Sequence, residues 1–203
     1  MTRSVAPRIQ RDNYRARDRD SPPYGWLQGL AAILNETAGV GSWCYSGSFA
    51  LFCWAWVKDG DARDPGDVDI LVADDKFHQV VAALAERGKQ GRTHTGYTPV
   101  DLTLKVVGLD QSETRFPVKI DVQLSGSKYG DVGDLVQLDK TNNFPVLSIE
   151  ALIGRKMKAS ELVRMQREFV DEKEAPPLSK DEKDLTLLEA LRNKDGDKTE
   201  DKE

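Results

Sequence analysis

The sequence predicts an α+β fold, α/β-like in its alternation, in which helices flank a small mixed β-sheet and a helical segment follows. Short runs rich in β-branched residues alternate with stretches of helical periodicity up to about residue 145, and a long helical pattern begins at residue 148. A chain of 203 residues is long enough for one domain with a sizeable core. We therefore expect one folded domain over residues 23–192, with its C-terminal helical part over 146–192.

The two ends of the chain have the composition of disordered segments. Residues 1–22 are rich in Arg and Asp and lack apolar periodicity, and residues 193–203 are mostly charged. Residues 171–203 hold twelve acidic and seven basic residues, which accounts for the net charge of -5 of the whole chain. The acidic balance therefore gives no support for a strong nucleic-acid binder, and it does not exclude local basic patches.

Helical and strand patterns alternate in the first half of the expected domain. Apolar residues recur at helical spacing over residues 24–37, which indicates an amphipathic helix. The elements expected next are a strand over 43–45, a helix over 49–57, a strand over 67–72 and a helix over 76–88. Gly47 and Ser48 form the turn before the second helix, where open backbone N–H groups favour an anion. Such a pair is a weak signal by itself.

The second half is expected to hold a hairpin and two helices. Apolar runs over 99–107 and 117–124 are separated by a polar turn, which favours antiparallel pairing. Ser148 is expected to cap a basic helix that extends to residue 169. Ser179 and Glu182 have the spacing of a capping box for a last helix over 180–191.

Other features exclude some classes of protein. Cys44 and Cys53 lie in apolar runs, which favours buried, reduced thiols and a cytoplasmic location. Residues 37–57 carry no charge, but Gly and Ser interrupt their first half, so we expect no transmembrane helix and no membrane partner. His78 and His94 have no partners at metal-ligand spacing, and both are expected at the surface.

The chemical signal of the sequence is a pair of carboxylates. Asp67 and Asp69 are separated by one residue at the start of an apolar strand, so both side chains point to the same side. Two neighbouring acids repel each other unless a cation lies between them. Mg²⁺ suits such a pair because it binds one or two carboxylates and completes its shell with water and substrate phosphate.

A third carboxylate is harder to place from the sequence. Asp121 stands within an apolar strand, where an unpaired charge costs several kcal/mol to bury. It therefore either lies at an edge facing water or faces a metal. Asp101, in the preceding strand, is an alternative third carboxylate.

Taken together, these motifs resemble the DNA polymerase β-like nucleotidyltransferase superfamily. The matching motifs are Gly47-Ser48, then Asp67-Val68-Asp69, then Asp121 on a later strand. The chain looks most like the minimal bacterial branch, which includes antibiotic nucleotidyltransferases and abortive-infection (toxin–antitoxin) toxins. Many of those carry an arginine before the acidic pair, as Arg63 does here, and a helix lysine, matched by Lys156. The chain departs from the compact pattern in having eighteen residues between Ser48 and Asp67.

The resemblance implies transfer of a nucleoside monophosphate from an NTP to an acceptor hydroxyl, with release of pyrophosphate. It implies that Asp67, Asp69 and Asp121 bind two Mg²⁺ ions (or Mn²⁺) and carry out catalysis. The residues implied to bind the nucleotide, which could be ATP or another NTP, are Gly47, Ser48, Arg63 and Lys156. The acceptor could be tRNA, a protein or a small molecule. An Asp-x-Asp glycosyltransferase and a catalytically silent nucleotide-binding module stay open as alternatives.

Overall fold

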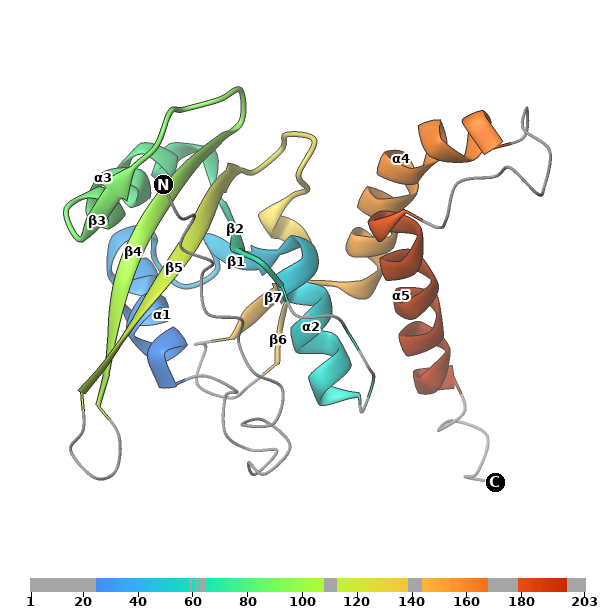
Figure 1. Cartoon of the computed structure of the whole chain (residues 1–203), viewed down its shortest axis with the longest axis horizontal. Helices are drawn as coiled ribbons and strands as arrows, with labels where there is room; N and C mark the ends of the chain where they lie inside the picture. The colour runs from blue at the N-terminus through green and yellow to red at the C-terminus, as the bar shows by residue number, and fades with distance from the viewer. Residues whose placement is uncertain are drawn as a thin grey trace, which may run out of the picture.

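The computed structural model describes residues 25–58, 60, 62, 65–107, 113–138, 144–167 and 179–196. They form a mixed seven-stranded sheet with five α-helices around it (Figure 1), which confirms the predicted α+β class. The strand order is β3-β4-β5-β2-β1-β7-β6. The arm expected over 1–22 lies outside the described residues.

Two parallel strand pairs lie inside an otherwise antiparallel sheet. Strand β2 runs parallel to β5, and β1 runs parallel to β7. The strands are β1 (Trp43–Ser46), β2 (Val68–Val72), β3 (Gly88–Gln90), β4 (Tyr97–Val107), β5 (Glu113–Leu124), β6 (Leu135–Gln137) and β7 (Pro145–Leu147). The long β4–β5 pair is antiparallel, as the hairpin prediction required.

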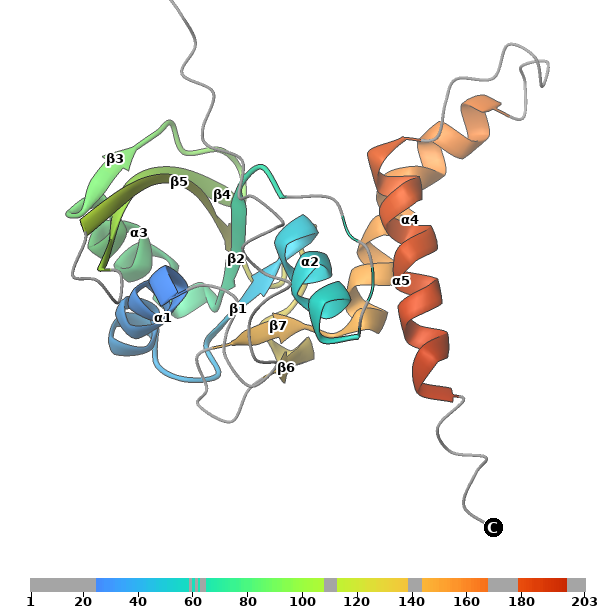
Figure 2. The same ribbon diagram turned by 60° about the horizontal axis from the view of Figure 1, so that its bottom comes forward.

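The helices cover the sheet in two groups. They are α1 (Gly25–Ala38), α2 (Gly47–Val57), α3 (Phe77–Ala85), α4 (Ile149–Arg167) and α5 (Lys180–Gly196). Helices α1 and α3 lie together against the β3–β5 half of the sheet, and α2, α4 and α5 lie on the other side of the molecule (Figures 1 and 2). Helix α2 contacts β1, β2 and both C-terminal helices, so it joins the two parts.

Local capping signals are confirmed at both C-terminal helices. Ser148 Oγ accepts a hydrogen bond from the Ala151 N–H at 3.2 Å, at the start of α4. At α5, the Glu182 carboxylate accepts from the Ser179 N–H at 2.8 Å, and Ser179 Oγ accepts from the Glu182 N–H at 3.2 Å. This reciprocal pair is the predicted capping box. Three leucines of α5 are buried, namely Leu185, Leu188 and Leu191.

Several predicted boundaries are wrong. Helix α2 begins at Gly47 and not at residue 49, so the predicted turn is the first turn of the helix. The helix expected over 76–88 ends at Ala85, and Gly88 begins the edge strand β3. Helix α5 continues to Gly196, into the segment expected to be disordered. Strands β3, β6 and β7 were not predicted, because three residues are too few to show a period.

The cysteines and histidines have the burial and exposure predicted for them. Cys44 and Cys53 are buried free thiols. Burial raises the pKa of both thiols, with nearby acidic charges adding to the effect at Cys44. None of the described helices has both the length and the apolar character needed to cross a membrane. His78 and His94 are exposed, as expected.

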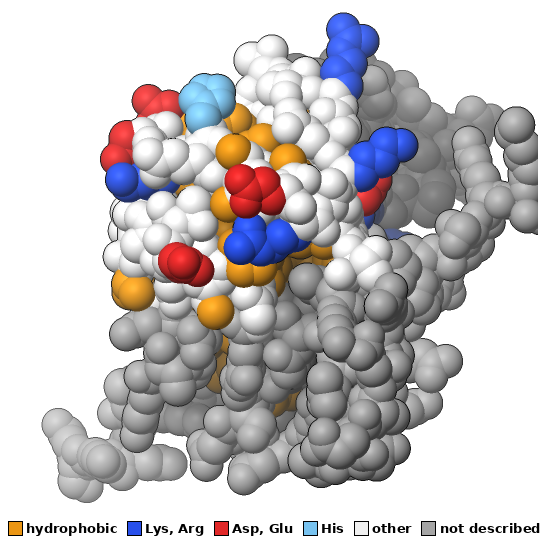
Figure 3. All heavy atoms as spheres, turned by 90° about the vertical axis from the view of Figure 1, so that its left-hand side faces the viewer, with side chains coloured by type: hydrophobic (Ala, Val, Ile, Leu, Met, Phe, Trp, Pro, Cys, Tyr) orange, Lys and Arg blue, Asp and Glu red, His pale blue; other side chains and the backbone are white. Residues whose placement is uncertain are grey.

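Acidic and basic side chains are interspersed on the face that holds α3, β3 and β4 (Figure 3). A protein that follows a nucleic-acid backbone usually presents a continuous basic stripe. The described part of this face carries no such stripe.

Candidate active site

Sheet register brings the sequence-predicted carboxylates together. Asp69 of β2 is directly opposite Ser46 on the antiparallel neighbour β1 and directly opposite Asp121 on the parallel neighbour β5. Asp67 immediately precedes β2 and shares the side of Asp69, because side chains alternate along a strand. Asp101 lies one strand further out, on β4, where its register partner is Lys119. The pairing thus places Asp121, and not Asp101, beside Asp69.

Gly47 allows the start of α2 to lie against Asp69. A β-carbon built on Gly47 would lie 1.9 Å from Asp69 Oδ2, well inside any allowed contact. Gly47 also has φ of 60°, in the left-handed region that favours glycine. A glycine is therefore required at this position for both conformation and space. As a result, α2 begins directly against the Asp69 carboxylate.

A buried hydrogen-bond chain fixes the orientation of Asp69. Ser46 Oγ donates to Gln123 Oε1 at 2.9 Å, and Gln123 Nε2 donates to Asp69 Oδ1 at 2.5 Å. Ser46 and Gln123 are both buried. Ser46 is the N-cap residue of α2, and its side chain makes no capping hydrogen bond to the helix. Its hydroxyl therefore does not compete for the N–H groups of the first turn.

Lys119 lies between the two outer carboxylates. Its ammonium is 3.6 Å from Asp67 Oδ2 and 3.3 Å from Asp121 Oδ1. Burial acts to lower the pKa of Lys119, but the charges and hydrogen bonds of Asp121 and Asp67 outweigh it and raise that pKa. Lys119 therefore provides a tethered positive charge at the site. It was not predicted from the sequence.

The surroundings of Asp69 raise its pKa. Burial raises its pKa from 3.8 to about 6, against the lowering effect of the Arg155 charge. The charges of Asp67 and Asp121 raise the pKa further, and Lys156 lowers it. A carboxylate held in this way is stabilised by any additional cation that approaches it.

The donor set fits a divalent cation in chemistry. Three carboxylates are the hard oxygen ligands that Mg²⁺ prefers. Asp121 Oδ1 is buried and accepts no hydrogen bond from the described residues, because the Lys119 ammonium, 3.3 Å from it, donates to the other oxygen, Oδ2. As the side chains stand, no three His, Cys, Asp or Glu residues in the described ranges converge on one point that would hold a metal. The Lys119 ammonium lies where the outer carboxylates would converge, so a metal there requires Lys119 to move.

Helix α4 supplies two cations near Asp69 that differ in their partners. Lys156, predicted to contact nucleotide, is buried and makes ion pairs at 2.6 Å with Asp181 and 2.9 Å with Asp184 of α5. Arg155 stands over the ring of Tyr129 at 5.4 Å. Arg63, the other predicted phosphate ligand, lies outside the described residues, and Ser48 is buried in the first turn of α2.

Two residues of the site follow the alternation of β5 and could have been found from it. Lys119 and Gln123 lie two residues before and after Asp121, so all three share one face of the strand. Arg155 is adjacent to Lys156 in the sequence, and no periodic signal distinguished their roles. Ser46 precedes the predicted Gly47-Ser48 turn directly.

No known family model and no curated protein sequence matches the chain. Among solved structures, it is similar to a candidate nucleotidyltransferase from Thermotoga maritima, with 17% identity, a TM-score of 0.38, and coverage of 70% of this chain and 93% of that one. It is similar to ANT(2″)-Ia in complex with adenylyl-2″-tobramycin, with 12% identity, a TM-score of 0.47, and coverage of 86% and 99%.

The chain is also similar to the Megavirus polyadenylate synthase. The identity is 13%, the TM-score is 0.42, and the match covers 85% of this chain and 35% of that one. These similarities concern overall shape at low identity. The function proposed for this chain therefore rests on the residues of its own site.

Proposed function

We propose that this protein is a nucleotidyltransferase that moves a nucleoside monophosphate from an NTP to an acceptor hydroxyl. The observation that carries the proposal is the register of Asp69 between Ser46 and Asp121, directly at the N-terminus of α2. Carboxylates beside the N-terminus of a helix support metal binding next to phosphate binding. Transfer of a nucleotidyl group needs both.

In the proposed reaction, the acceptor oxygen forms a bond to the α-phosphorus of the NTP. The bond from that phosphorus to the bridging oxygen breaks, and pyrophosphate leaves. Asp121 is proposed to accept the acceptor's proton at Oδ1, which is buried and accepts no hydrogen bond from the described residues, although the Lys119 ammonium lies 3.3 Å away. Asp67, Asp69 and Asp121 would hold Mg²⁺ (two ions, with Mn²⁺ as an alternative), which supplies neutralisation of charge on the attacking and leaving oxygens.

The N-terminus of α2 is proposed to bind the leaving phosphates. The Ser46 hydroxyl is used by Gln123, and the N-cap makes no side-chain bond to the helix. Gly47 and Ser48 are proposed to bind phosphate oxygens through backbone N–H groups at the positive end of the helix. Arg63 and Lys156 are proposed to add positive charge to this subsite, Lys156 by acting at a distance through its field.

The acceptor is proposed to be an RNA such as a tRNA, with a protein side chain or a small-molecule hydroxyl as the alternatives, in a cytoplasmic setting. The likeness of the downstream helices to toxin-type nucleotidyltransferases favours RNA. The balanced charge of residues 1–170 favours none of the three.

A catalytically silent nucleotide-binding module is the second candidate. Lys119 favours it, because an ammonium 3.3 Å from Asp121 already neutralises part of the acidic site. The two candidates differ in one product, since only the enzyme releases pyrophosphate. A glycosyltransferase using the same acids would consume a nucleotide-sugar and would release none from an NTP.

Label transfer tests the proposal and identifies the acceptor. The protein is incubated with each α-labelled NTP and Mg²⁺ or Mn²⁺, and with total RNA, protein lysate or aminoglycosides in separate reactions. We expect label on one acceptor pool with the native chain and none with Asp69→Ala. If Asp67→Asn kept near-normal transfer, the metal-binding role of the acidic pair would be wrong.

A further inference from the structure

Arg155 makes no ion pair within the described part of the chain. Its Nη1 is buried and has no hydrogen-bond partner among the described residues. Its guanidinium carbon lies over the ring of Tyr129, 5.4 Å from the ring centroid. A buried guanidinium nitrogen without an acceptor is costly, so such a group is retained where an outside acceptor completes it.

Lys156, the next residue, is in the opposite situation. Its ammonium is held by two carboxylates of α5, at 2.6 and 2.9 Å. Most of its hydrogen-bonding capacity is therefore used inside the protein, and it joins α4 to α5. Of the two cations, Arg155 is the one with donors still to offer to a ligand.

Aromatic rings within the protein hold the guanidinium of Arg155 in place. Tyr129 lies in the loop after β5 and packs edge-on against Tyr97, with ring centroids 5.9 Å apart. Tyr97 in turn stacks on His94 at 4.7 Å, with the rings 9° from parallel. A guanidinium over an aromatic face keeps its planar N–H edge available for hydrogen bonds. This row of rings therefore orients Arg155 without using its donors.

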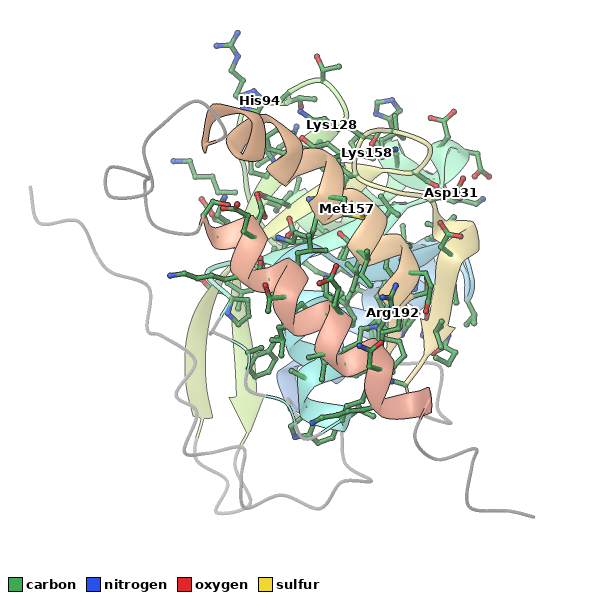
Figure 4. The ribbon with its side chains drawn as sticks, turned by 90° about the vertical axis from the view of Figure 1, so that its right-hand side faces the viewer. His94, Lys128, Asp131, Met157, Lys158 and Arg192 are labelled. Carbon is green, nitrogen blue, oxygen red and sulfur yellow. The ribbon has the colours of Figure 1, made fainter. Side chains whose placement is uncertain are left out.

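The charge of Arg155 also acts on the acidic site. Its charge is the largest of the effects that lower the pKa of Asp69, ahead of that of Lys156. Lys128 lies over the same Tyr129 ring, 5.1 Å from its centroid, and adds a second positive charge. Lys128 and His94 lie toward the same end of the molecule in Figure 4.

We propose that Arg155 binds the triphosphate of the nucleotide donor directly, and that Lys156 acts mainly by fixing α4 on α5. The planar fork of a guanidinium can make two parallel hydrogen bonds to phosphate oxygens, which a lysine cannot. This inference rests on the proposed nucleotidyltransferase function and assigns its phosphate contact to a residue that sequence reasoning did not single out.

Binding of inorganic triphosphate with Mg²⁺, measured by calorimetry, tests this role independently of the base and of turnover. We expect the native chain to bind it and Arg155→Gln to bind it about tenfold more weakly or worse. Arg155→Lys, which keeps the charge but not the fork, should lie between them. Lys158→Gln removes a charge from the exposed side of the same helix and Arg192→Gln from α5 (Figure 4), and both should bind like the native chain.

Thermal unfolding separates binding from folding. Arg155 is half-buried, and its buried Nη1 has no acceptor among the described residues, so Arg155→Gln should unfold at the same temperature as the native chain or higher. A destabilised Arg155→Gln that binds triphosphate normally would show a structural role and overturn the proposal.

A second arm distinguishes the two sources of phosphate. A single-stranded RNA oligonucleotide is titrated without NTP, and Arg155→Gln should bind it like the native chain. Weaker RNA binding with unchanged triphosphate binding would assign Arg155 to the acceptor and overturn the proposal. Equal triphosphate binding by the native chain and Arg155→Gln would overturn this inference alone. A native chain that binds neither triphosphate nor any NTP would overturn the proposed function as well.

Discussion

The carboxylate of Asp69 occupies the space into which a side chain on Gly47 would extend. A β-carbon at Gly47 would meet Asp69 Oδ2 at 1.9 Å and its carboxyl carbon at 2.8 Å. The backbone at the start of α2 is therefore in contact with the Asp69 carboxylate of strand β2. This contact sets how closely bound phosphate and bound metal could approach each other.

Gly47→Ala should remove activity by displacing Asp69, and it should destabilise the fold. Gly41→Ala is a matched control, because Gly41 also has positive φ, 86°, but nothing lies within 4 Å of its added β-carbon. We expect Gly41→Ala to cost roughly 1–3 kcal/mol from backbone strain alone and to keep the site intact. Chemical denaturation and pyrophosphate release measure both effects. Equal activity in the two variants would contradict the close contact.

Asp69 should make stability depend on pH in metal-free buffer. Its folded-state pKa, about 6, lies above 3.8, so the ionised carboxylate destabilises the fold above pH 6, and this effect disappears as the pH falls below 4. Asp69→Asn lacks the ionisation and still accepts the Gln123 hydrogen bond. At pH 7 the variant should be more stable by roughly 3 kcal/mol at most, a difference that shrinks toward pH 4. A constant difference from pH 4 to 7 would show that the Asp69 pKa is not raised.

Lys119→Met should strengthen metal binding. The Lys119 ammonium lies 3.6 Å from Asp67 and 3.3 Å from Asp121, so it competes with any cation at these oxygens. Lys119 is about half exposed, so we expect a gain on the order of 1 kcal/mol, which is several-fold in the affinity for Mg²⁺ or Mn²⁺. Calorimetric titration measures it, with Lys89→Met, an exposed lysine on β3, as the control. Weaker metal binding in Lys119→Met would show that Lys119 supports the metal site.

Lys156→Met should destabilise the protein far more than the same substitution at a neighbouring lysine. It removes the ammonium that offsets the buried charge of Asp184, which costs about 3–5 kcal/mol at buried ion pairs. Lys158→Met makes the same change at an exposed position of α4, where about 0.5 kcal/mol or less is expected. Adding Asp184→Leu to Lys156→Met should recover part of the loss. Denaturant titration of the native chain, the two lysine variants and the double variant measures these free energies of unfolding. Equal stability of Lys156→Met and Lys158→Met would contradict a buried, paired Lys156.

Local patterns predicted those parts of the fold that depend on neighbouring residues in the sequence. The capping box of Ser179 and Glu182 lies within one helical turn, and its hydrogen bonds form as predicted. Strand β7 could not be found in this way, because it has three residues and begins with a proline. It exists because β1 and β6 pair with it from either side.

The site shows the same division. Asp67 and Asp69 were identifiable because strand alternation places them on one side. Choosing Asp121 over Asp101 required the register of β2 on β5, which no local pattern encodes. The partners of Lys156 lie on another helix, beyond the segment 168–178, so the sequence could not show that this lysine is paired while Arg155 is not.

Pyrophosphate release is the most direct test of nucleotidyl transfer. The native chain and Asp69→Asn are each supplied with the four NTPs, Mg²⁺ or Mn²⁺, and the acceptor pool that takes up label. Pyrophosphate should appear in equal amount to labelled acceptor, and Asp69→Asn should release at least about a hundredfold less while remaining folded. Absence of pyrophosphate from the native chain with every NTP and acceptor pool, or undiminished release by Asp69→Asn, would contradict the proposed function.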